Sequence, residues 1–284
     1  MLSLCRIGWS KLPINKQAVH LQAVLVSNRR IGVYHQLVLE IGDLVKHVKP
    51  GHFIAISVGG EASKMVLRRA FAISRISDRG TIELIVSPQG AGSKWLCAQS
   101  EGSAIDVITP LGTNFGIPTE PVTALLVGGG YGSAPLFGLA EMLKSRGCRV
   151  VMALGASTAS KIYAPLEGKR AATLLKIFTE DGSAGDQGRV TDVLADLISE
   201  YDARVIYSCG PMPMLEAVSQ IAIAHDIAHQ CAVEESMACG VGICMTCVIP
   251  VKTTTGEIKN LRSCIDGPVM DGDFVQWHLV GKQL

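Results

Sequence analysis

Four cysteines near the end of the sequence have the residue type and the spacing to hold a metal centre. Cys239, Cys244 and Cys247 form a C-x4-C-x2-C run, and sixteen residues separate Cys247 from Cys264. Thiolates favour soft metal centres, which leaves a [2Fe–2S] cluster and zinc as the alternatives. Structural zinc commonly takes two C-x2-C pairs, whereas only one pair has that form here, so the spacing favours the cluster. Such a cluster carries one electron at a time, and the chain is predicted to take part in electron transfer.

A strand-like segment at 67–74 contains two neighbouring arginines. Arg69 can hold a pyrophosphate through charge-assisted hydrogen bonds, and Phe71 with the backbone after it can lie along a flat ring. Taken alone, the motif favours a simpler alternative, a solvated pair of Arg68 and Arg69 in front of an ordinary strand. The candidate cofactor-binding residues of this segment are Arg69, Ala70, Phe71, Ala72 and Ser74.

A glycine-rich turn follows further along the chain, where Gly90, Gly92 and Ser93 precede or begin a predicted helix at Ser93–Gln99. A helix N-terminus offers free N–H groups and a favourable dipole to a phosphate. The alternative is a plain helix cap in which Ser93 is the capping residue. Together with Arg69 on the same barrel, this turn indicates a site for a flavin dinucleotide, FAD.

A second glycine turn lies between the buried strand Ala124–Val127 and a helix. Gly128, Gly130 and Gly132 are spaced two apart and Ser133 takes the last place, so the turn lacks the strict G-x-G-x-x-G of a dinucleotide fingerprint. A lone glycine-rich turn is weak evidence, and it needs support from another strand end.

That support comes from Cys209, Gly210 and Pro211, which end another predicted strand. Ligands bind at the carboxyl ends of parallel strands, so these residues and the glycine turn predict an NAD site. Cys209 is either a buried core cysteine or a side chain that faces a nicotinamide, and the second interpretation is preferred. A 2′-phosphate needs Arg or Lys beside the ribose. The acidic pair at 180–181, with Lys161 as the only nearby cation, leads us to expect NADH over NADPH.

The hydrophobic pattern changes along the chain. Short alternating runs predict six strands and a small antiparallel barrel with one helix; the strands are His20–Val26, Tyr34–Glu40, His52–Ser57, Phe71–Ile76, Ile82–Ser87 and Ala104–Thr109. Beyond about 122, strands alternate with helices, which predicts a parallel sheet covered on both faces. The predicted strands are Ala124–Val127, Arg149–Leu154, Leu174–Phe178 and Arg204–Cys209. One predicted helix ends near Arg146, and two others span Thr191–Glu200 and Met212–Ala224. We therefore expect an N-terminal extension at 1–17, an FAD-binding barrel at 18–119, an NAD-binding α/β domain at 120–228 and a [2Fe–2S] domain at 229–284.

Composition narrows the class of protein. The 284 residues include 26 basic and 25 acidic side chains, and a net charge of +1 gives no reason to expect a nucleic acid or an anionic membrane as partner. No stretch is long and apolar enough for a membrane helix, and the N-terminus is not a convincing signal peptide. Of nine cysteines, four are predicted ligands and the other five are scattered, a pattern that suits the reducing cytoplasm.

The chain resembles a known family of flavoproteins. Five motifs occur in the order typical of ferredoxin–NAD(P)H reductase-like proteins, namely Arg69–Ala72, Gly90–Ser93, Pro110–Gly112, Gly128–Pro135 and Cys209–Pro211. The tail at 235–247 is similar to that of the electron-transfer subunits of NAD-linked (class 1B) dihydroorotate dehydrogenases. The likeness extends from about His20 onward. The flavin motif departs from the family pattern at Ala70, where Pro is common, and at Phe71, where Tyr or Ile often stands.

The resemblance implies a chain of carriers. NADH gives a hydride to FAD, FAD passes single electrons to the cluster, and the cluster exchanges electrons with the FMN of a separate catalytic subunit that interconverts dihydroorotate and orotate in pyrimidine (UMP) biosynthesis. In biosynthesis the same carriers work in the reverse direction, and the electrons run from dihydroorotate towards NAD. The resemblance also implies a heterotetramer with two chains of each kind, and no catalytic residue for orotate on this chain.

Two alternatives stay open at this point. Related subunits serve hydrogenases or transhydrogenases, although their cluster loops tend to have Asp-Gly before the first cysteine, where this chain has Met237 and Ala238. The tail could instead be a zinc-bound interaction module on a protein that catalyses nothing.

Overall fold

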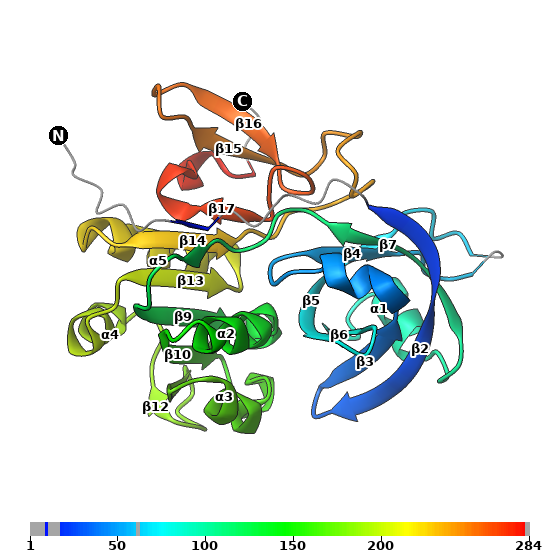
Figure 1. The fold of residues 1–284 in the computed structure, drawn as a ribbon, viewed down its shortest axis with the longest axis horizontal. Helices are drawn as coiled ribbons and strands as arrows, with labels where there is room; N and C mark the ends of the chain where they lie inside the picture. Colours follow the sequence, from blue (N-terminus) through cyan, green and yellow to red (C-terminus); the bar gives the residue numbers. More distant parts are fainter. Residues whose placement is uncertain (1–8, 11–17, 61–62, 282–284) are drawn as a thin grey trace.

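The computed structural model describes residues 9–10, 18–60 and 63–281. A barrel and an α/β sheet lie side by side, and the C-terminal segment runs across the top of both in Figure 1. The predicted N-terminal extension at 1–17 lies outside the described residues except for β1 (Trp9–Ser10), which pairs with β8 (Ile117–Pro118). Within the described part of the chain, no helix has the length and apolar character needed to cross a membrane.

The barrel is closed by six antiparallel strands in the order β2-β3-β6-β5-β4-β7. Alternate side chains of these strands point inward, and Leu37, Ile54 and Leu84 are fully buried in its core because strand periodicity places every second residue on one face. The predicted six-stranded barrel is therefore confirmed. Its elements are β2 (Val19–Ile31), β3 (Tyr34–Glu40), η1 (Gly42–His47), β4 (Phe53–Ile56), β5 (Arg69–Ser77), β6 (Thr81–Val86), α1 (Ala91–Cys97) and β7 (Ala104–Leu111).

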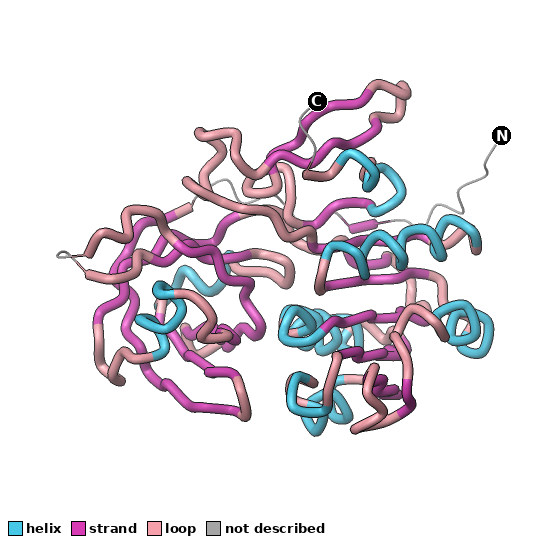
Figure 2. The backbone as a smooth tube through the Cα atoms, turned by 180° about the vertical axis from the view of Figure 1, so that it is seen from behind, coloured by secondary structure: helices cyan, strands magenta, loops and turns pink. Residues whose placement is uncertain are grey.

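The α/β part is built on a seven-stranded sheet with the order β12-β11-β10-β9-β13-β14-β17, in which only β17 runs antiparallel to its neighbour. Figure 2 shows the same sheet from behind, with helices on both of its faces. The strands are β9 (Thr123–Gly129), β10 (Arg149–Ala156), β11 (Leu174–Thr179), β12 (Asp186–Gln187), β13 (Val205–Cys209), β14 (Ala228–Ala232) and β17 (Val269–Asp271). The helices are η2 (Gly130–Ser133), α2 (Pro135–Ser145), η3 (Ala159–Lys161), α3 (Pro165–Ala171), α4 (Leu194–Tyr201) and α5 (Met212–Ala224).

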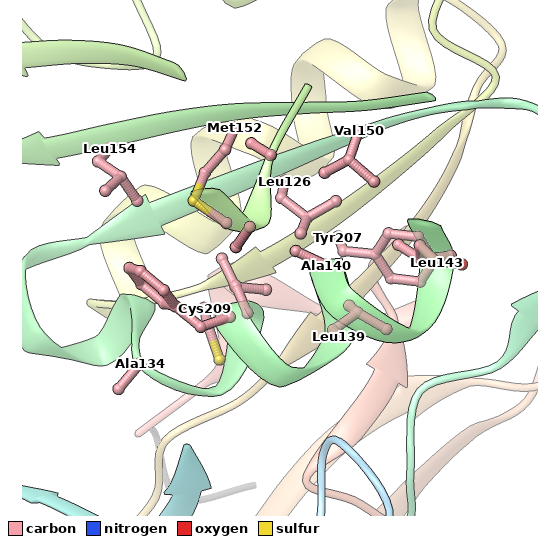
Figure 3. Packing of buried hydrophobic residues seen from close by; sticks show 14 of the residues in the cluster. Leu126, Ala134, Leu139, Ala140, Leu143, Val150, Met152, Leu154, Tyr207 and Cys209 are labelled. Carbon is pink, nitrogen blue, oxygen red and sulfur yellow. The ribbon is translucent and has the colours of Figure 1, made fainter. Parts of the chain in front are cut away.

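The continuous apolar runs of β9 and β10 follow from burial on both faces of the sheet. Leu126 and Met152 face α2 and α3, as Figure 3 shows for the α2 side, whereas Leu125 and Val151 face α4 and α5. A parallel sheet with covered faces requires this pattern, and the prediction of such a sheet is confirmed.

Two predicted helix starts differ from the structure. Helix α1 begins at Ala91 rather than Ser93, because the Ser93 hydroxyl reaches back to accept a hydrogen bond from the Gly90 N–H at 3.1 Å. Helix α4 begins at Leu194 rather than Thr191, because the Asp192 carboxylate accepts from the Arg189 N–H at 2.9 Å and holds this segment as a turn.

The C-terminal segment adds a hairpin of β15 (Val248–Lys252) and β16 (Ile258–Arg262), followed by η4 (Gly272–Phe274) and η5 (Trp277–Leu279). Strands β14 and β17 lie within 229–284 for most of their length, yet both extend the α/β sheet. The cluster segment is thus joined to the sheet by strand pairing. The division of the chain at 228/229 stays a prediction.

Candidate functional site

A cavity of about 460 Å³ lies between the barrel, the α/β sheet and the C-terminal segment. Most of the residues predicted to bind a cofactor line it, namely Arg69, Ala70, Phe71, Ala72, Gly90, Gly92, Ser93, Gly132, Cys209 and Gly210. We call this space the flavin cavity. Its walls combine one arginine with apolar side chains and glycine backbone on the barrel side and with Glu234 and Glu235 on the C-terminal side. The arginine and the apolar part suit a ligand with a flat ring and a pyrophosphate.

The two neighbouring arginines have different partners. Arg68 pairs with Asp106 at 2.6 Å and also donates to the Asp106 carbonyl at 3.2 Å, so it ties β5 to β7. Arg69 instead lines the flavin cavity, and within the described residues its guanidinium donates to two nearby carbonyls, that of Leu67 at 2.7 Å and that of Arg68 at 3.4 Å. Of the two, Arg69 is therefore the one placed to meet an anionic ligand.

The turn at 90–93 leaves room beside Arg69. A Cβ on Gly92 would lie 3.1 Å from Arg69 Nε, whereas a Cβ on Gly90 would have no neighbour within 4 Å. The absence of a Cβ on Gly92 thus leaves room for the Arg69 side chain, and the backbone of Gly90 is open at the start of α1. Glycine backbone next to a guanidinium is a suitable cradle for phosphate, so the residues fit FAD.

Two predicted cofactor residues line neither the flavin cavity nor the cavity at the carboxyl ends of the parallel strands. Ser74 is buried and donates to the Ala134 carbonyl at 3.1 Å, at the contact between β5 and α2. Gly128 allows the chain to double back, since a Cβ there would lie 2.5 Å from the Cβ of Ser133. Ser74 thus joins the barrel to the α/β part, and Gly128 makes room for the turn after β9.

A second cavity of about 820 Å³ lies at the carboxyl ends of the parallel strands, and Gly130, Gly132, Gly210 and Pro211 line it. We call it the nucleotide cavity. A Cβ on Gly132 would lie 2.9 Å from the Gly210 Cα, so these two glycines let the turns after β9 and β13 touch. Gly130 has a φ of +54° and nothing within 4 Å of a Cβ, which leaves its backbone open to a ligand.

The far part of the nucleotide cavity carries both signs of charge. Glu180, which follows β11, lines it together with Lys161, as expected from the sequence. Arg189 also lines it, so the expectation that Lys161 is the only nearby cation was wrong, because the chain after β12 brings Arg189 to the same cavity.

Two further residues at the junction of the cavities were missed. Tyr131 and Glu234 line both spaces, and the Tyr131 ring lies 5.6 Å from the Tyr34 ring of the barrel. Burial raises the pKa of Cys209 to about 12, and the nearby Glu234 carboxylate adds to the shift. Glu234 comes shortly after the parallel strand β14, and this position at a carboxyl strand end was the available signal.

The four predicted cluster cysteines influence one another as two neighbouring pairs. Cys239 contributes to lowering the pKa of Cys244, and Cys247 contributes to raising the pKa of Cys264. We call them the outer pair and the inner pair, since Cys244 is exposed whereas Cys247 and Cys264 are buried. Among the described residues, no group of three or more metal-binding side chains surrounds a single ion position. Two pairs fit a centre with two irons, each of which takes two thiolates.

Hydrogen bonds reach the outer pair from its own loop. The N–H groups of Val241 and Ile243 point at Cys239 Sγ at 3.4 and 3.3 Å. The Thr246 hydroxyl donates to Cys244 Sγ at 3.1 Å, and this bond is the main reason why the pKa of Cys244 falls to about 6. Donors around sulfur are what a thiolate-bound cluster needs.

Comparisons with known proteins bear on each part of this arrangement. Residues 234–276 match the family model described as the iron–sulfur cluster binding domain of dihydroorotate dehydrogenase B. Residues 126–220 match the oxidoreductase NAD-binding domain.

Relatives match over most of their length. The dihydroorotate dehydrogenase B (NAD(+)) electron transfer subunit of Shouchella clausii is 39% identical over 242 residues, which are 83% of this chain and 89% of the relative. The subunit of Listeria monocytogenes is 37% identical over 245 residues, 85% and 92% of the two chains.

Solved structures share the fold. An NADH-dependent reduced ferredoxin-NADP oxidoreductase structure, described for flavin-based electron bifurcation, superposes with a TM-score of 0.79 at 26% identity over 90% of each chain. The FAD/NAD binding domain of a Vibrio cholerae nitric oxide dioxygenase gives 0.59 at 22% identity, over 73% of this chain and 94% of that one. These findings support the predicted cofactors FAD, an iron–sulfur cluster and NAD, and the oxidoreductase class. The chain belongs to the family of electron transfer subunits of NAD(+)-linked dihydroorotate dehydrogenase B.

Proposed function

We propose that this chain relays electrons between NAD(H) and the FMN of a dihydroorotate dehydrogenase catalytic subunit, in de novo pyrimidine biosynthesis. One observation carries the proposal. The nucleotide cavity and the flavin cavity share Tyr131 and Glu234, and the flavin cavity shares Phe53 and Met237 with the apolar packing around the inner pair. Three cofactor sites thus follow one another in the order that a relay from a hydride donor to a one-electron centre requires.

In the flavin cavity, Arg69 holds the pyrophosphate of FAD and Gly90 to Ser93 support it with backbone. Bound FAD supplies the exchange between a hydride and single electrons. Phe71 and Ala72 lie along the ring system, and Cys209 stays a neutral thiol because burial keeps its pKa near 12. Such a thiol adds no charge where the nicotinamide meets the flavin.

In the nucleotide cavity, the turns at 130–132 and 210–211 receive the dinucleotide. Glu180 faces the cavity just past β11 and would repel a 2′-phosphate, which favours NADH over NADPH. Lys161 and Arg189 line the same cavity and oppose that preference. Comparing kcat/KM for the two donors in dye reduction decides the matter, and a higher value with NADPH would reverse the assignment.

In the cluster loop, Cys239, Cys244, Cys247 and Cys264 hold a [2Fe–2S] cluster. Val241, Ile243 and Ile265 expose apolar side chains around it, and Ile243 is 80% exposed. A contiguous apolar surface of this kind suits a protein partner. We assign this docking face to the FMN-containing catalytic subunit, in a cytoplasmic heterotetramer of two chains of each kind, with the orotate-forming site on the partner.

Reconstitution tests the relay. The isolated chain should reduce dyes with NADH and leave orotate unchanged, and addition of the catalytic chain of the same organism should create NAD-linked dihydroorotate oxidation. Activity of the isolated chain on orotate would contradict the relay. Failure to associate with that catalytic chain would favour a hydrogenase or transhydrogenase partner, the second candidate, which the fold match to a bifurcating oxidoreductase supports.

The variant Arg69→Ala tests the flavin site. A hydrogen bond to a charged group contributes about 1.5–3 kcal/mol, so FAD content after purification should fall roughly tenfold or more while the fold persists. Arg68→Ala is the matched control, because the Arg68 guanidinium bonds Asp106 instead. This variant should lower the Tm and leave the FAD content near that of the wild type. Unchanged FAD retention in Arg69→Ala would show that the pyrophosphate is held elsewhere.

A further inference from the structure

Two side chains connect the flavin cavity with the inner pair. Phe53 and Met237 line the cavity, and both also belong to the apolar cluster that contains Cys247 and Cys264. Among the described residues, they alone do both. Each therefore lies between the flavin cavity and the apolar packing to which the two buried thiols belong.

The structure fixes Phe53 from several directions, and Met237 is half-buried against the same apolar packing. Phe53 begins β4 and is 3% exposed, and its ring would lie 3.0 Å from a Cβ placed on Gly112. The Gly267 carbonyl accepts a hydrogen bond from the Thr113 N–H at 2.6 Å, which ties the loop after Cys264 to the barrel. A Cβ on Gly240 would lie 3.8 Å from Phe53, so the cysteine loop packs directly against β4.

The inner pair has apolar side chains packed with it, beside the buried hydroxyl of Ser263. Besides the two thiols, the members of this apolar packing are Phe53, Ala55, Leu111, Ile108 and Met237. The outer pair, by contrast, receives the Thr246 hydroxyl and backbone N–H groups. An apolar shell controls both the access of solvent to a metal centre and its local dielectric, and methionine adapts its shape to fill such a gap.

We propose that Phe53 and Met237 form a dry wall between the flavin cavity and the inner pair, with Met237 as the positioning residue that keeps water out of the electron path. The inference rests on the proposed function, since it assumes FAD on one side and the cluster on the other. Water admitted at this wall would stabilise the more negative, reduced state of the cluster and so raise its reduction potential.

Four variants of the chain with FAD and cluster bound test the wall. Met237→Ala opens it, Met237→Gln keeps its length but makes it polar, and Met237→Leu keeps it apolar. Met245→Ala is the matched control, since Met245 also lies in the cysteine loop but is 51% exposed to solvent. Stopped-flow mixing with NADH gives the rates of flavin and cluster reduction in one experiment, and an EPR-monitored titration gives the cluster potential.

We expect the ratio of cluster to flavin reduction rates to change on the order of tenfold in Met237→Ala and Met237→Gln, and to stay near wild type in Met237→Leu and Met245→Ala. The cluster potential should be higher in the Ala and Gln variants than in the Leu variant. If Met237→Ala does not retain both cofactors, the rate ratio and the cluster potential of Met237→Gln, compared with those of Met237→Leu, test the wall. Wild-type ratios and potentials in Met237→Gln overturn the wall. Absence of FAD or iron from the wild-type chain would instead refute the proposed function.

Discussion

The outer and inner cysteine pairs belong to one binding site but are held by different forces. The outer pair lies in a loop without regular structure, near exposed apolar side chains, and hydrogen bonds lower the pKa of Cys244 to about 6. The inner pair is packed against the barrel, and burial raises the pKa of Cys264 to about 12. One side of the predicted cluster site is thus open to solvent, and the other is packed against the rest of this chain.

This difference gives the cluster site a direction. The inner pair shares its packing with the wall of the flavin cavity, and exposed apolar side chains lie near the outer pair. In the proposed relay, electrons would therefore pass between flavin and cluster on the buried side, and between cluster and partner on the exposed side. The following experiments change one side at a time.

The largest effect should come from replacing a ligand of either pair with serine. Cys244→Ser and Cys264→Ser should both lose nearly all iron and acid-labile sulfide, of which two each are expected per wild-type chain, together with the EPR signal of the reduced cluster. Stoichiometric zinc without sulfide in anaerobically prepared wild-type protein would contradict the cluster itself.

The two serine variants should still differ in stability. Both lack the cluster, so a comparison between them isolates the burial of the new hydroxyl. At Cys264, which is fully buried, an unpaired hydroxyl costs about 1–3 kcal/mol, whereas at the exposed Cys244 it costs little. Calorimetry should therefore give a lower Tm for Cys264→Ser, and equal values would remove the distinction between the pairs.

The next effect should appear at the docking face. Burying an isoleucine at an interface contributes about 1.5–3 kcal/mol, so Ile243→Glu should weaken binding of the catalytic subunit by roughly 10- to 100-fold. Ile223→Glu is the matched control, because Ile223 is 56% exposed on α5, away from the cysteine loop. Titration calorimetry measures the affinity, and NADH–dye turnover should be unchanged in both. Equal loss in the two variants would point to a general charge effect.

The sequence was informative where chemistry depends on local spacing. The cysteine run identified four candidate ligands that the fold brings into one region, and β3 and α5 have the predicted bounds. The sequence pattern of Arg68 and Arg69 does not show which of the two meets a ligand. The structure does, because Arg68 is held in an ion pair with Asp106 and Arg69 is not.

The sequence was uninformative where residues meet across elements. Ser74 continues the alternation of Ala70 and Ala72, but β5 changes register between Ile73 and Arg75. Helix α2 then covers Ser74, so it is buried instead of lining the cavity. Tyr131, Glu234 and Met237 acquire their places only when β14, the barrel and the cysteine loop converge, and no spacing within one segment encodes that.

The smallest effect should come from a single hydrogen bond of the outer pair. Thr246→Val removes the hydroxyl that donates to Cys244 at 3.1 Å while keeping the shape of the side chain. A donor near sulfur stabilises the more negative reduced cluster, so the reduction potential should fall modestly in Thr246→Val and stay near wild type in Thr246→Ser. Thr246→Val removes a group that stabilises the reduced cluster, whereas Met237→Gln admits water that stabilises it, so the two changes in potential should be opposite in sign. EPR-monitored titration of the three variants decides, and shifts of the same sign would show that the two sides of the cluster do not tune it independently.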